Sequence, residues 1–339
     1  MINNNVNVCL IGTGRAGMIH AKNLNTRVPN ANLIAICDTS QESLEKAKEN
    51  LSVKYTYNNY EEALDNEEID AVVIVTPTKL HKDIVIKAAK KKKHILCEKP
   101  LARTVEDCDE MIKVVNQNNV KLQVGFMRRF DESFREAKKV IDSGELGEIV
   151  LVKSLTRGPS KPQPWMYDIN ISGGPIAEVN SHDLDTVRWF SDSEVKSIYS
   201  IGGNFRLREI AEKYPDFYDT VSMNIELEDG MIAAIDGAQY VQYGYDARVE
   251  ILGTHGNLML GDTKRNNITQ FSKNGIIKNQ FIESWRDLFS NAYLNEDIAF
   301  VNAVLNDTQP FVTGKDGRQA VKLVKMGIDS LLSGKPVFA

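Results

Sequence analysis

The stretch VNVCLIGTGRAG, residues 6–17, decides the fold of this 339-residue chain. Its first six residues predict a buried strand, and the G-x-G-x-x-G loop after it leads into a helical pattern. In that setting Gly12 allows a tight turn, Gly14 lets the main chain approach a pyrophosphate, and Gly17 lets the helix pack on the strand. The helix N-terminus would attract the phosphates. We therefore predict a dinucleotide site at Gly12, Gly14, Arg15, Ala16 and Gly17.

An acidic residue further along the chain indicates which dinucleotide binds. Asp38 closes the second predicted strand, 21 residues after Gly17 (38 minus 17). A carboxylate there can accept hydrogen bonds from the ribose hydroxyls and would repel a 2′-phosphate, so NAD is favoured over NADP. Thr76 and Pro77 follow the third main strand at its carboxyl end, where open parallel sheets bind ligands. We expect them to line the nicotinamide side of the site, with His81, Glu98 and Lys99, although His81 could instead begin a helix or pack in the core.

Short apolar runs alternate with longer amphipathic ones through the first part of the chain. This alternation is typical of a parallel sheet wound with helices on both faces. We therefore predict an α/β protein whose residues 1–124 form a Rossmann domain, a doubly wound parallel sheet with strands at 6–11, 33–37, 71–75, 94–97 and 120–124.

Beyond Gly144 the pattern changes to alternating strands, with a turn at Asp229-Gly230 between two of them. Residues 125–339 are predicted to form a second α/β domain, built on a large, mostly antiparallel open sheet. Helical runs at 177–190 and 293–305 would cover one face of that sheet. The last amphipathic run, 317–332, could return to either domain. The expected strands are 149–156, 195–201, 221–227, 231–238, 248–252 and 257–260.

The composition is that of a folded globular protein, with 42% hydrophobic and 26% charged residues. A net charge of -5 gives no positive field for nucleic acid, and no apolar run is long enough to cross a membrane. The four cysteines form no C-x-x-C pair, so we expect neither a metal site nor a disulfide framework. No secretion signal is recognised, and a cytoplasmic location is expected.

Lys99 lies at the end of a later apolar strand, in the run Cys97-Glu98-Lys99-Pro100. Hydride transfer from an alcohol needs a group that removes the hydroxyl proton and a cation that stabilises the developing oxyanion. Lys99 can supply the cation and could also relay a proton. The alternative is a surface lysine paired with Glu98, which Pro100 makes less attractive because proline shapes the backbone before it.

The glycine-proline turn at residues 173–175 starts a predicted helix that carries Glu178 and His182 four residues apart. Side chains at that spacing share a face. His182 fits a general base, and Glu178 fits a partner that orients it or binds a substrate hydroxyl. A pair of this kind is more often only solvated.

These motifs together resemble the glucose-fructose oxidoreductase, inositol 2-dehydrogenase and rhizopine-catabolism (Gfo/Idh/MocA) family. The similarity runs through nearly the whole chain and rests on residues 12–17, 76–78 with His81, 98–100, 125–131 (GFMRRFD) and 181–185 (SHDLD). Residues 243–246 (YGYD), 250–254 (EILGT) and 289–296 (FSNAYLNE) are similar to its inositol and sugar dehydrogenase branch.

The resemblance implies NAD(P)-dependent oxidation of a ring hydroxyl on a sugar or cyclitol, with Lys99 and His182 as catalytic residues. It also implies a second domain whose exposed sheet commonly mediates formation of a dimer or tetramer. Glu178 is a departure, since many inositol dehydrogenases carry aspartate four residues before the histidine. The longer side chain would place the carboxylate differently, which leaves the substrate open.

The sequence thus predicts an NAD-dependent dehydrogenase acting on an inositol or sugar, with seven further residues as substrate contacts. Aromatic members of that set are also common in protein cores. Two other functions stay open: a non-redox enzyme that uses NAD transiently to cleave a glycosidic bond, and a catalytically silent NAD-binding regulator, which should lack the lysine or the histidine. The substrate candidates are Arg128, Arg157, Tyr167, Asn180, Tyr243, Tyr245 and Tyr293.

Overall fold

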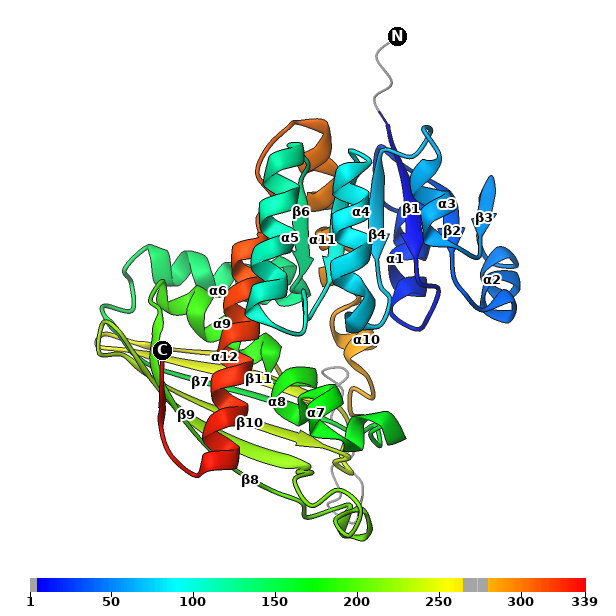
Figure 1. The fold of residues 1–339 in the computed structure, drawn as a ribbon. Helices are drawn as coiled ribbons and strands as arrows, with labels where there is room; N and C mark the ends of the chain where they lie inside the picture. Colours follow the sequence, from blue (N-terminus) through cyan, green and yellow to red (C-terminus); the bar gives the residue numbers. More distant parts are fainter. Residues whose placement is uncertain (1–4, 265–272, 274–279) are drawn as a thin grey trace. The chain divides into compact units, whose positions relative to one another are not determined.

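The computed structural model describes residues 5–264, 273 and 280–339. The chain divides into two compact units (Figure 1). The first contains the chain up to Asp131 together with Ser290–Val321, and the second contains Glu132–Phe289 together with Lys322–Ala339. The first unit therefore includes residues 125–131 and 290–321, which the sequence-based boundary placed in the second domain. None of the described helices combines the length and the apolar character needed to cross a bilayer.

The first unit is built on six parallel strands, which confirms the predicted doubly wound sheet. Their order is β3-β2-β1-β4-β5-β6, so the winding reverses between β1 and β4. Ligands of such sheets bind outside the carboxyl ends of the strands at this reversal. β3 was not predicted, because three residues are too few to show a pattern. The strands are β1 (Val6–Ile11), β2 (Ala31–Cys37), β3 (Tyr55–Tyr57), β4 (Ala71–Ile74), β5 (His94–Glu98) and β6 (Leu122–Gly125).

Apolar side chains fill both faces of this sheet. Along β1, Cys9 and Ile11 belong to one buried cluster, while Val8 and Leu10 belong to another. Alternate residues of a strand point to opposite faces, so helices must cover both. The helical segments are α1 (Gly17–Thr26), α2 (Gln41–Lys48), α3 (Tyr60–Asp65), η1 (Thr78–Leu80), α4 (His81–Lys90), α5 (Val105–Asn118), η2 (Met127–Phe130), α11 (Ser290–Leu305) and the start of α12 (Gly314–Ser333).

Helix α11 belongs to the Rossmann unit, so the prediction that residues 293–305 cover the second sheet was wrong. Its Phe300 and Val301 are fully buried in the same cluster as Leu10. Helical periodicity shows that one face of a helix is apolar. It does not show which sheet that face covers.

The second unit is built on seven strands in the order β12-β11-β7-β10-β9-β8-β13. Among the described strands β7 and β10 form its parallel pair, and the other neighbours are antiparallel, which confirms the mostly antiparallel prediction. Gly230, with φ of +89°, lies in the predicted turn between β9 and β10. The strands are β7 (Ile149–Gly158), β8 (Val195–Gly203), β9 (Thr220–Leu227), β10 (Ile232–Gln239), β11 (Asp246–Gly253), β12 (Asn257–Leu260) and β13 (Val337–Phe338).

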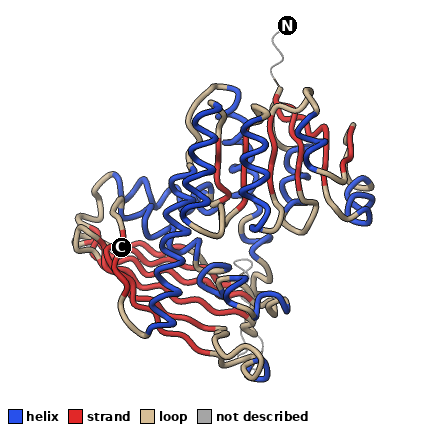
Figure 2. The backbone as a smooth tube through the Cα atoms, viewed as in Figure 1, coloured by secondary structure: helices blue, strands red, loops and turns tan. Residues whose placement is uncertain are grey.

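Helices lie along one face of this second sheet, and the other, open face carries no helix in the described part of the chain (Figure 2). The residues of β9 that face the helices, among them Met223, are buried, and Gly327 of α12 packs against Met223 and Ile176. The main-chain N–H of Ser200 donates to the Ser330 hydroxyl of α12. The described helical segments of this unit, not all of which cover the sheet, are α6 (Glu132–Asp142), η3 (Pro164–Tyr167), α7 (Ile169–Ser172), α8 (Gly174–Glu178), α9 (Ser181–Ser191), η4 (Arg208–Ile210), α10 (Trp285–Leu288) and the end of α12.

Candidate active site

The glycine loop leaves β1 and enters α1 with space beside its middle glycine. Gly12 has φ of +102°, and a Cβ there would lie 2.6 Å from the main-chain oxygen of Val75. A Cβ on Gly17 would lie 1.9 Å from the main-chain oxygen of Gly12, so the helix and the loop are in contact. A Cβ on Gly14 would meet no atom within 4 Å. Gly14 and Arg15 are exposed at the start of α1, where the helix N-terminus attracts phosphates, and Ala16 caps that helix.

Asp38 anchors this loop from the end of β2. Its Oδ2 accepts hydrogen bonds from the main-chain N–H and the hydroxyl of Thr13, at 2.8 and 2.9 Å. Its Oδ1 accepts from the main-chain N–H of Ser40 at 2.9 Å. A carboxylate has about four lone-pair directions, so a partly exposed Asp38 can still accept from a ribose hydroxyl.

His81 joins the segments that follow β4 and β5. Its Nε2 lies 2.8 Å from the main-chain oxygen of Thr76, and its Nδ1 lies 2.9 Å from that of Pro100. Burial lowers the pKa of His81, against the opposing effect of these carbonyls. Both ring nitrogens face main-chain oxygens of this chain, and this geometry favours the packing role over a cofactor contact. The Thr76 hydroxyl is buried with no hydrogen-bond partner in the described part of the chain, and Pro77 is exposed.

A buried polar cluster lies directly beside Lys99 in sequence. The Oε2 of Glu98 accepts the main-chain N–H of Lys99 at 2.9 Å. The Oε1 of Glu98 lies 3.2 Å from Nε2 of His20, and Nδ1 of His20 lies 2.6 Å from Asp297. Burial by itself lowers the pKa of His20, but the charges and hydrogen bonds of Asp297 and Glu98 outweigh it and raise that pKa well above its ordinary value. The segment that carries Lys99 is thus held by a charged network.

Glu178 and His182 do not lie on one helix, so the prediction that they share a helical face was wrong. Helix α8 ends at Glu178, and α9 begins at Ser181. Asn180 lies in the break, where its side-chain Nδ2 donates to Asp183 Oδ2 at 2.8 Å and to the main-chain oxygen of Asp236 at 3.1 Å. Side-chain bonds of this kind compete with helix formation, which explains the interruption.

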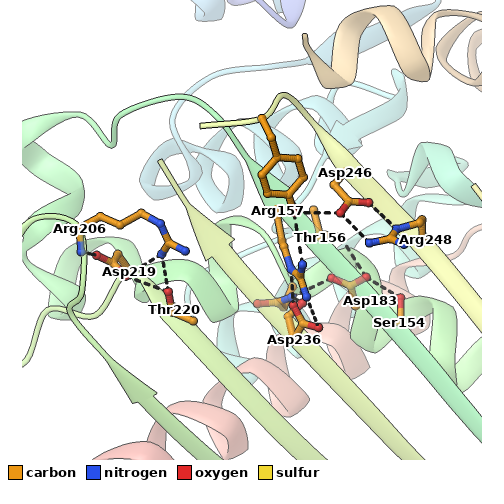
Figure 3. Close-up of polar contacts among 12 residues, drawn as sticks. Ser154, Thr156, Arg157, Asp183, Arg206, Asp219, Thr220, Asp236, Asp246 and Arg248 are labelled. Atoms are coloured by element: carbon orange, nitrogen blue, oxygen red, sulfur yellow. Dashed lines mark hydrogen bonds and ion pairs between the residues drawn. The ribbon is translucent and has the colours of Figure 1, made fainter. Parts of the chain in front are cut away.

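His182 lies in the first turn of α9, which Asp183 fixes to the sheet. Asp183 is fully buried, and its Oδ1 accepts from the hydroxyls of Ser154 at 2.6 Å and Thr156 at 3.0 Å (Figure 3). Both hydroxyls come from β7. The adjacent His182 is 7% exposed. Its main chain is therefore set by a hydrogen-bonded carboxylate rather than by helix propensity alone.

Arg157 lies on the opposite face of the second sheet. Ser154 and Thr156 of β7 point toward α9, so the odd-numbered residues around them point away from it. Arg157 makes a two-pronged ion pair with Asp236 at 2.8 and 2.9 Å (Figure 3), and its NH1 donates to the Tyr243 hydroxyl. The structure therefore places Arg157 on the face opposite to the one that packs against α9, and its role as a substrate contact stays a prediction.

The other substrate candidates differ in exposure. Asn180 and Arg128 are buried, as are Tyr245 and Tyr293. The ring of Tyr293 packs edge-on against His20, with centroids 5.4 Å apart. Tyr167 is partly exposed and packs against Tyr214 and Phe217.

Both halves of the chain match one known family. Residues 6–126 match an oxidoreductase family with an NAD-binding Rossmann fold, and residues 134–259 match the GFO/IDH/MocA C-terminal domain. The chain belongs to the Gfo/Idh/MocA oxidoreductase family. Its first unit is therefore an NAD-binding domain, and NAD is its cofactor, as the sequence predicted.

Three similar proteins cover nearly the whole of this Gfo/Idh/MocA oxidoreductase. The scyllo-inositol 2-dehydrogenase (NAD(+)) of Bacillus subtilis is 34% identical over 98% of this chain and 96% of its own. The myo-inositol 2-dehydrogenase of Thermotoga maritima is 32% identical over 93% and 92% of the two chains. The crystal structure of scyllo-inositol dehydrogenase from Lactobacillus casei, with bound NAD(H) and scyllo-inositol, has a TM-score of 0.90 and 29% identity, covering 98% of this chain and 99% of that one.

The residues of this Gfo/Idh/MocA oxidoreductase fit NAD. The space beside Gly14 can take the pyrophosphate, and Asp38 can take a ribose hydroxyl. The buried Thr76 hydroxyl adds a polar group that a ligand could satisfy, in the segment that follows β4.

Sequence reasoning missed Asp183, His20, Glu296 and Asp297. Each is fully buried on the inner face of its helix, where apolar residues are expected. For Glu296 and Asp297 a signal was present, because both lie on the stripe of α11 that also carries Tyr293 and Phe300. A charged pair on an apolar stripe indicates a buried polar network.

Proposed function

We propose that this Gfo/Idh/MocA oxidoreductase oxidises one ring hydroxyl of an inositol or a related sugar to the ketone, with NAD as the acceptor. The observation that carries the proposal is the near full-length similarity to inositol dehydrogenases, at 34% and 32% identity. A preference for NAD over NADP is supported by the carboxylate of Asp38 at the end of β2.

His182 is proposed as the general base and Lys99 as the cation that stabilises the alkoxide. NAD, when bound, supplies the carbon that accepts the hydride, nicotinamide C4. The hydroxyl proton passes to an imidazole nitrogen of His182, and the C–H bond breaks with its electron pair leaving toward NAD. The charge that develops on the oxygen is then met by the Lys99 ammonium. The products are the ketone, NADH and one proton.

The surrounding residues are proposed to act in different ways. Glu178 is partly exposed at the end of α8, so it is a candidate for binding a substrate hydroxyl or for orienting the imidazole of His182. Tyr167 is a second candidate, since it is partly exposed on η3. The buried Asn180 is better explained by its bonds to Asp183 and Asp236.

The proposal includes a cytoplasmic enzyme that forms a homodimer or homotetramer. The four cysteines are free thiols, and all are buried. Exposed apolar side chains on the open face of the second sheet, such as Met259 at 79% exposure, support contact with a second copy.

The test is NADH formation at 340 nm with NAD or NADP and a panel of inositols, aldoses and their derivatives. Lys99→Met and His182→Asn should each lower kcat by about a hundredfold or more, while NADH still binds. Lys113→Met and His94→Asn are the matched controls, since Lys113 is exposed on α5 and His94 accepts a main-chain N–H from Lys121.

Two results would contradict the proposal. Full turnover in Lys99→Met would remove the assigned mechanism. Silence across the panel with tight NADH binding would favour the transient-redox glycosidase or the silent regulator instead.

A further inference from the structure

A continuous chain of hydrogen bonds connects α11 and α1 to the main chain of Lys99. We propose that His20, by bridging Asp297 and Glu98, is a positioning residue that sets the place of Lys99. The inference rests on the proposed function, in which Lys99 stabilises the alkoxide. It adds a residue that the reaction needs without any contact to the reacting atoms.

The first step is the protonation state of His20. Its two ring nitrogens each face a carboxylate oxygen, at 2.6 Å from Asp297 and 3.2 Å from Glu98. A carboxylate oxygen accepts hydrogen bonds, so a ring that donates to both must carry two N–H groups. The side chain is fully buried. His20 is therefore the cation of the cluster, with Tyr293 packed edge-on against its ring.

The second step is the transfer of this constraint to Lys99. Glu98 uses its second oxygen, Oε2, to accept the main-chain N–H of Lys99 at 2.9 Å. Glu98 pairs with Gly125 of β6, and a Cβ on Gly125 would lie 2.9 Å from the Glu98 carboxyl carbon and Oε2. The glutamate is thus enclosed on that side. Because both oxygens have fixed donors, the position of His20 determines where the Lys99 amide is held.

The third step is the anchoring of His20 itself. The second oxygen of Asp297, Oδ2, accepts the side-chain amide of Asn23 at 3.0 Å. Asn23 lies on α1, one turn after His20, and its own Oδ1 accepts from Arg27 at 3.2 Å. The chain of bonds therefore starts on α1, the helix that begins at the glycine loop, and crosses α11 before it reaches β5. Lys99 is positioned by the elements that bind the dinucleotide.

A third carboxyl group completes the cluster. Glu296 is fully buried, and its oxygens have no hydrogen-bond partner in the described part of the chain. Burial and the nearby charge of Glu98 raise the pKa of Glu296 well above its ordinary value, which favours its neutral form. His20 is the sole cation among these four side chains. Its loss would leave the charge of Glu98 without its partner.

The decisive variant is Glu98→Gln, which keeps the shape of the side chain but cannot accept from both His20 and the Lys99 amide. His20→Gln and Asp297→Asn test the hydrogen bonds of His20 with Glu98 and with Asp297. If His20→Gln does not fold, Glu98→Gln still tests the proposal. His94→Gln is the control, since His94 lies in the same unit and is partly exposed. Each variant is measured as the full chain, with turnover expressed per NADH-binding site so that unfolded protein does not count.

Glu98→Gln and His20→Gln should lower turnover per site by about tenfold to a hundredfold, as a misplaced catalytic group does. The KM for NAD should change by less than about threefold, because a lost transition-state contact lowers kcat. The same substitution is also made in a Lys99→Met protein, where the rate of single-turnover NADH formation is measured. Adding Glu98→Gln there should change this rate by less than about twofold, because the effects of residues that act through one another are not additive. His94→Gln should match the wild type.

A second readout does not depend on turnover. The rate at which acetic anhydride modifies Lys99, relative to Lys113, is measured by mass spectrometry. It should change by about threefold or more in Glu98→Gln and stay constant in His94→Gln, because amine reactivity follows its surroundings. If Lys99→Met kept full turnover, the proposed mechanism would fail, and this labelling would still decide whether His20 and Glu98 position the lysine.

Three outcomes would overturn the inference. The first is wild-type turnover and labelling in Glu98→Gln. The second is an equal loss from Glu98→Gln in the wild-type and Lys99→Met backgrounds, which is what a general structural role produces. The third is one equivalent of a divalent metal in the purified wild-type protein that is absent from His20→Gln. Donor atoms of His20, Glu98 and Glu296 lie within 4.8 Å of one another. An ion bound there would occupy the His20 ring nitrogen that is assigned to the hydrogen bond with Glu98.

Discussion

At the scale of single residues, the candidate site depends on polar side chains buried where the sequence pattern expects apolar ones. Asp183 on α9 and His20 on α1 are both fully buried and fully hydrogen-bonded to named partners. Buried polar groups are stable only when they are satisfied, so each one specifies a single arrangement of its neighbours. This is how side chains outside the reacting centre can fix Lys99 and His182.

Asp38 anchors the glycine loop and is proposed to select NAD over NADP. In Asp38→Asn the negative charge that repels a 2′-phosphate is removed, so we expect the KM for NADP to fall by about tenfold, the equivalent of about 1.4 kcal/mol. The KM for NAD should rise, because the amide holds Thr13 and the ribose less well. Steady-state kinetics with both cofactors measure this. Ser40→Ala is the control, because it removes only the cap of α2. An unchanged preference in Asp38→Asn would assign cofactor choice to other residues.

Glu296 should make stability depend on pH. Burial, with the charge of Glu98, raises its pKa in the folded chain. A raised folded pKa gives stability that is complete below the unfolded pKa and is lost as the pH rises through the folded value. Glu296→Gln removes that loss, which is at most about 1.4 kcal/mol per pH unit. Its Tm relative to that of the wild type should therefore rise as the pH increases above the ordinary pKa of glutamate, as followed by thermal unfolding.

Glu145→Gln serves as the comparison for that experiment, because Glu145 is exposed. Its Tm difference from the wild type should stay constant with pH. A Glu296→Gln protein that is destabilised equally at every pH would show that the carboxyl is ionised and paired in the folded chain.

At the scale of elements, the sequence predicted those with a long, regular pattern. The six residues of β1 and the hairpin of β9 and β10 were found because burial alternates or runs unbroken along them. The three residues of β3 and the two of β13 are too short to show periodicity. The break between α8 and α9 was missed because the bond from Asn180 to Asp236 joins residues that are distant in the sequence.

The close approach of β10 to that break can be tested with one methyl group. A Cβ on Gly237 would lie 1.9 Å from Oδ1 of Asn180, which is fully buried. Gly237→Ala should therefore cost about 1–3 kcal/mol of stability through overpacking. It should also lower kcat, because Asn180 holds Asp183 next to His182. NADH affinity should be unchanged, since the glycine loop belongs to the other unit.

Gly158→Ala is the matched control at the end of β7, where a Cβ would meet no atom within 4 Å. Thermal unfolding and an NADH titration on both variants complete the test. Equal stability of the two alanine variants would mean that Asn180 can leave its place without cost.

At the scale of the whole molecule, the two sheets differ in how they are covered. Both faces of the Rossmann sheet carry buried apolar clusters. The second sheet has one face packed with helices and one that carries ion pairs, such as Arg157 with Asp236, among exposed apolar side chains. Antiparallel sheets commonly have one face packed on the core and the other in contact with solvent. The large apolar side chains exposed on it are the basis for the proposed contact with a second copy.

The open face predicts self-association that a single charge should weaken. Ile201 on β8, Ile232 on β10 and Met259 on β12 are 59%, 53% and 79% exposed, and they span the width of the sheet. A stable interface buries about 800 Å² on each partner, which needs most of such a face. Ile232→Asp would place a charge at the start of the middle strand, where a covering partner would leave it desolvated and unpaired. Light scattering after size exclusion should therefore show a dimer or tetramer for the wild type and a lower mass for this variant.

Leu332→Asp on α12, with 54% exposure, should keep the wild-type mass. A wild-type protein that is monomeric at micromolar concentration would rule out this role for the face, and its apolar side chains would then need another explanation.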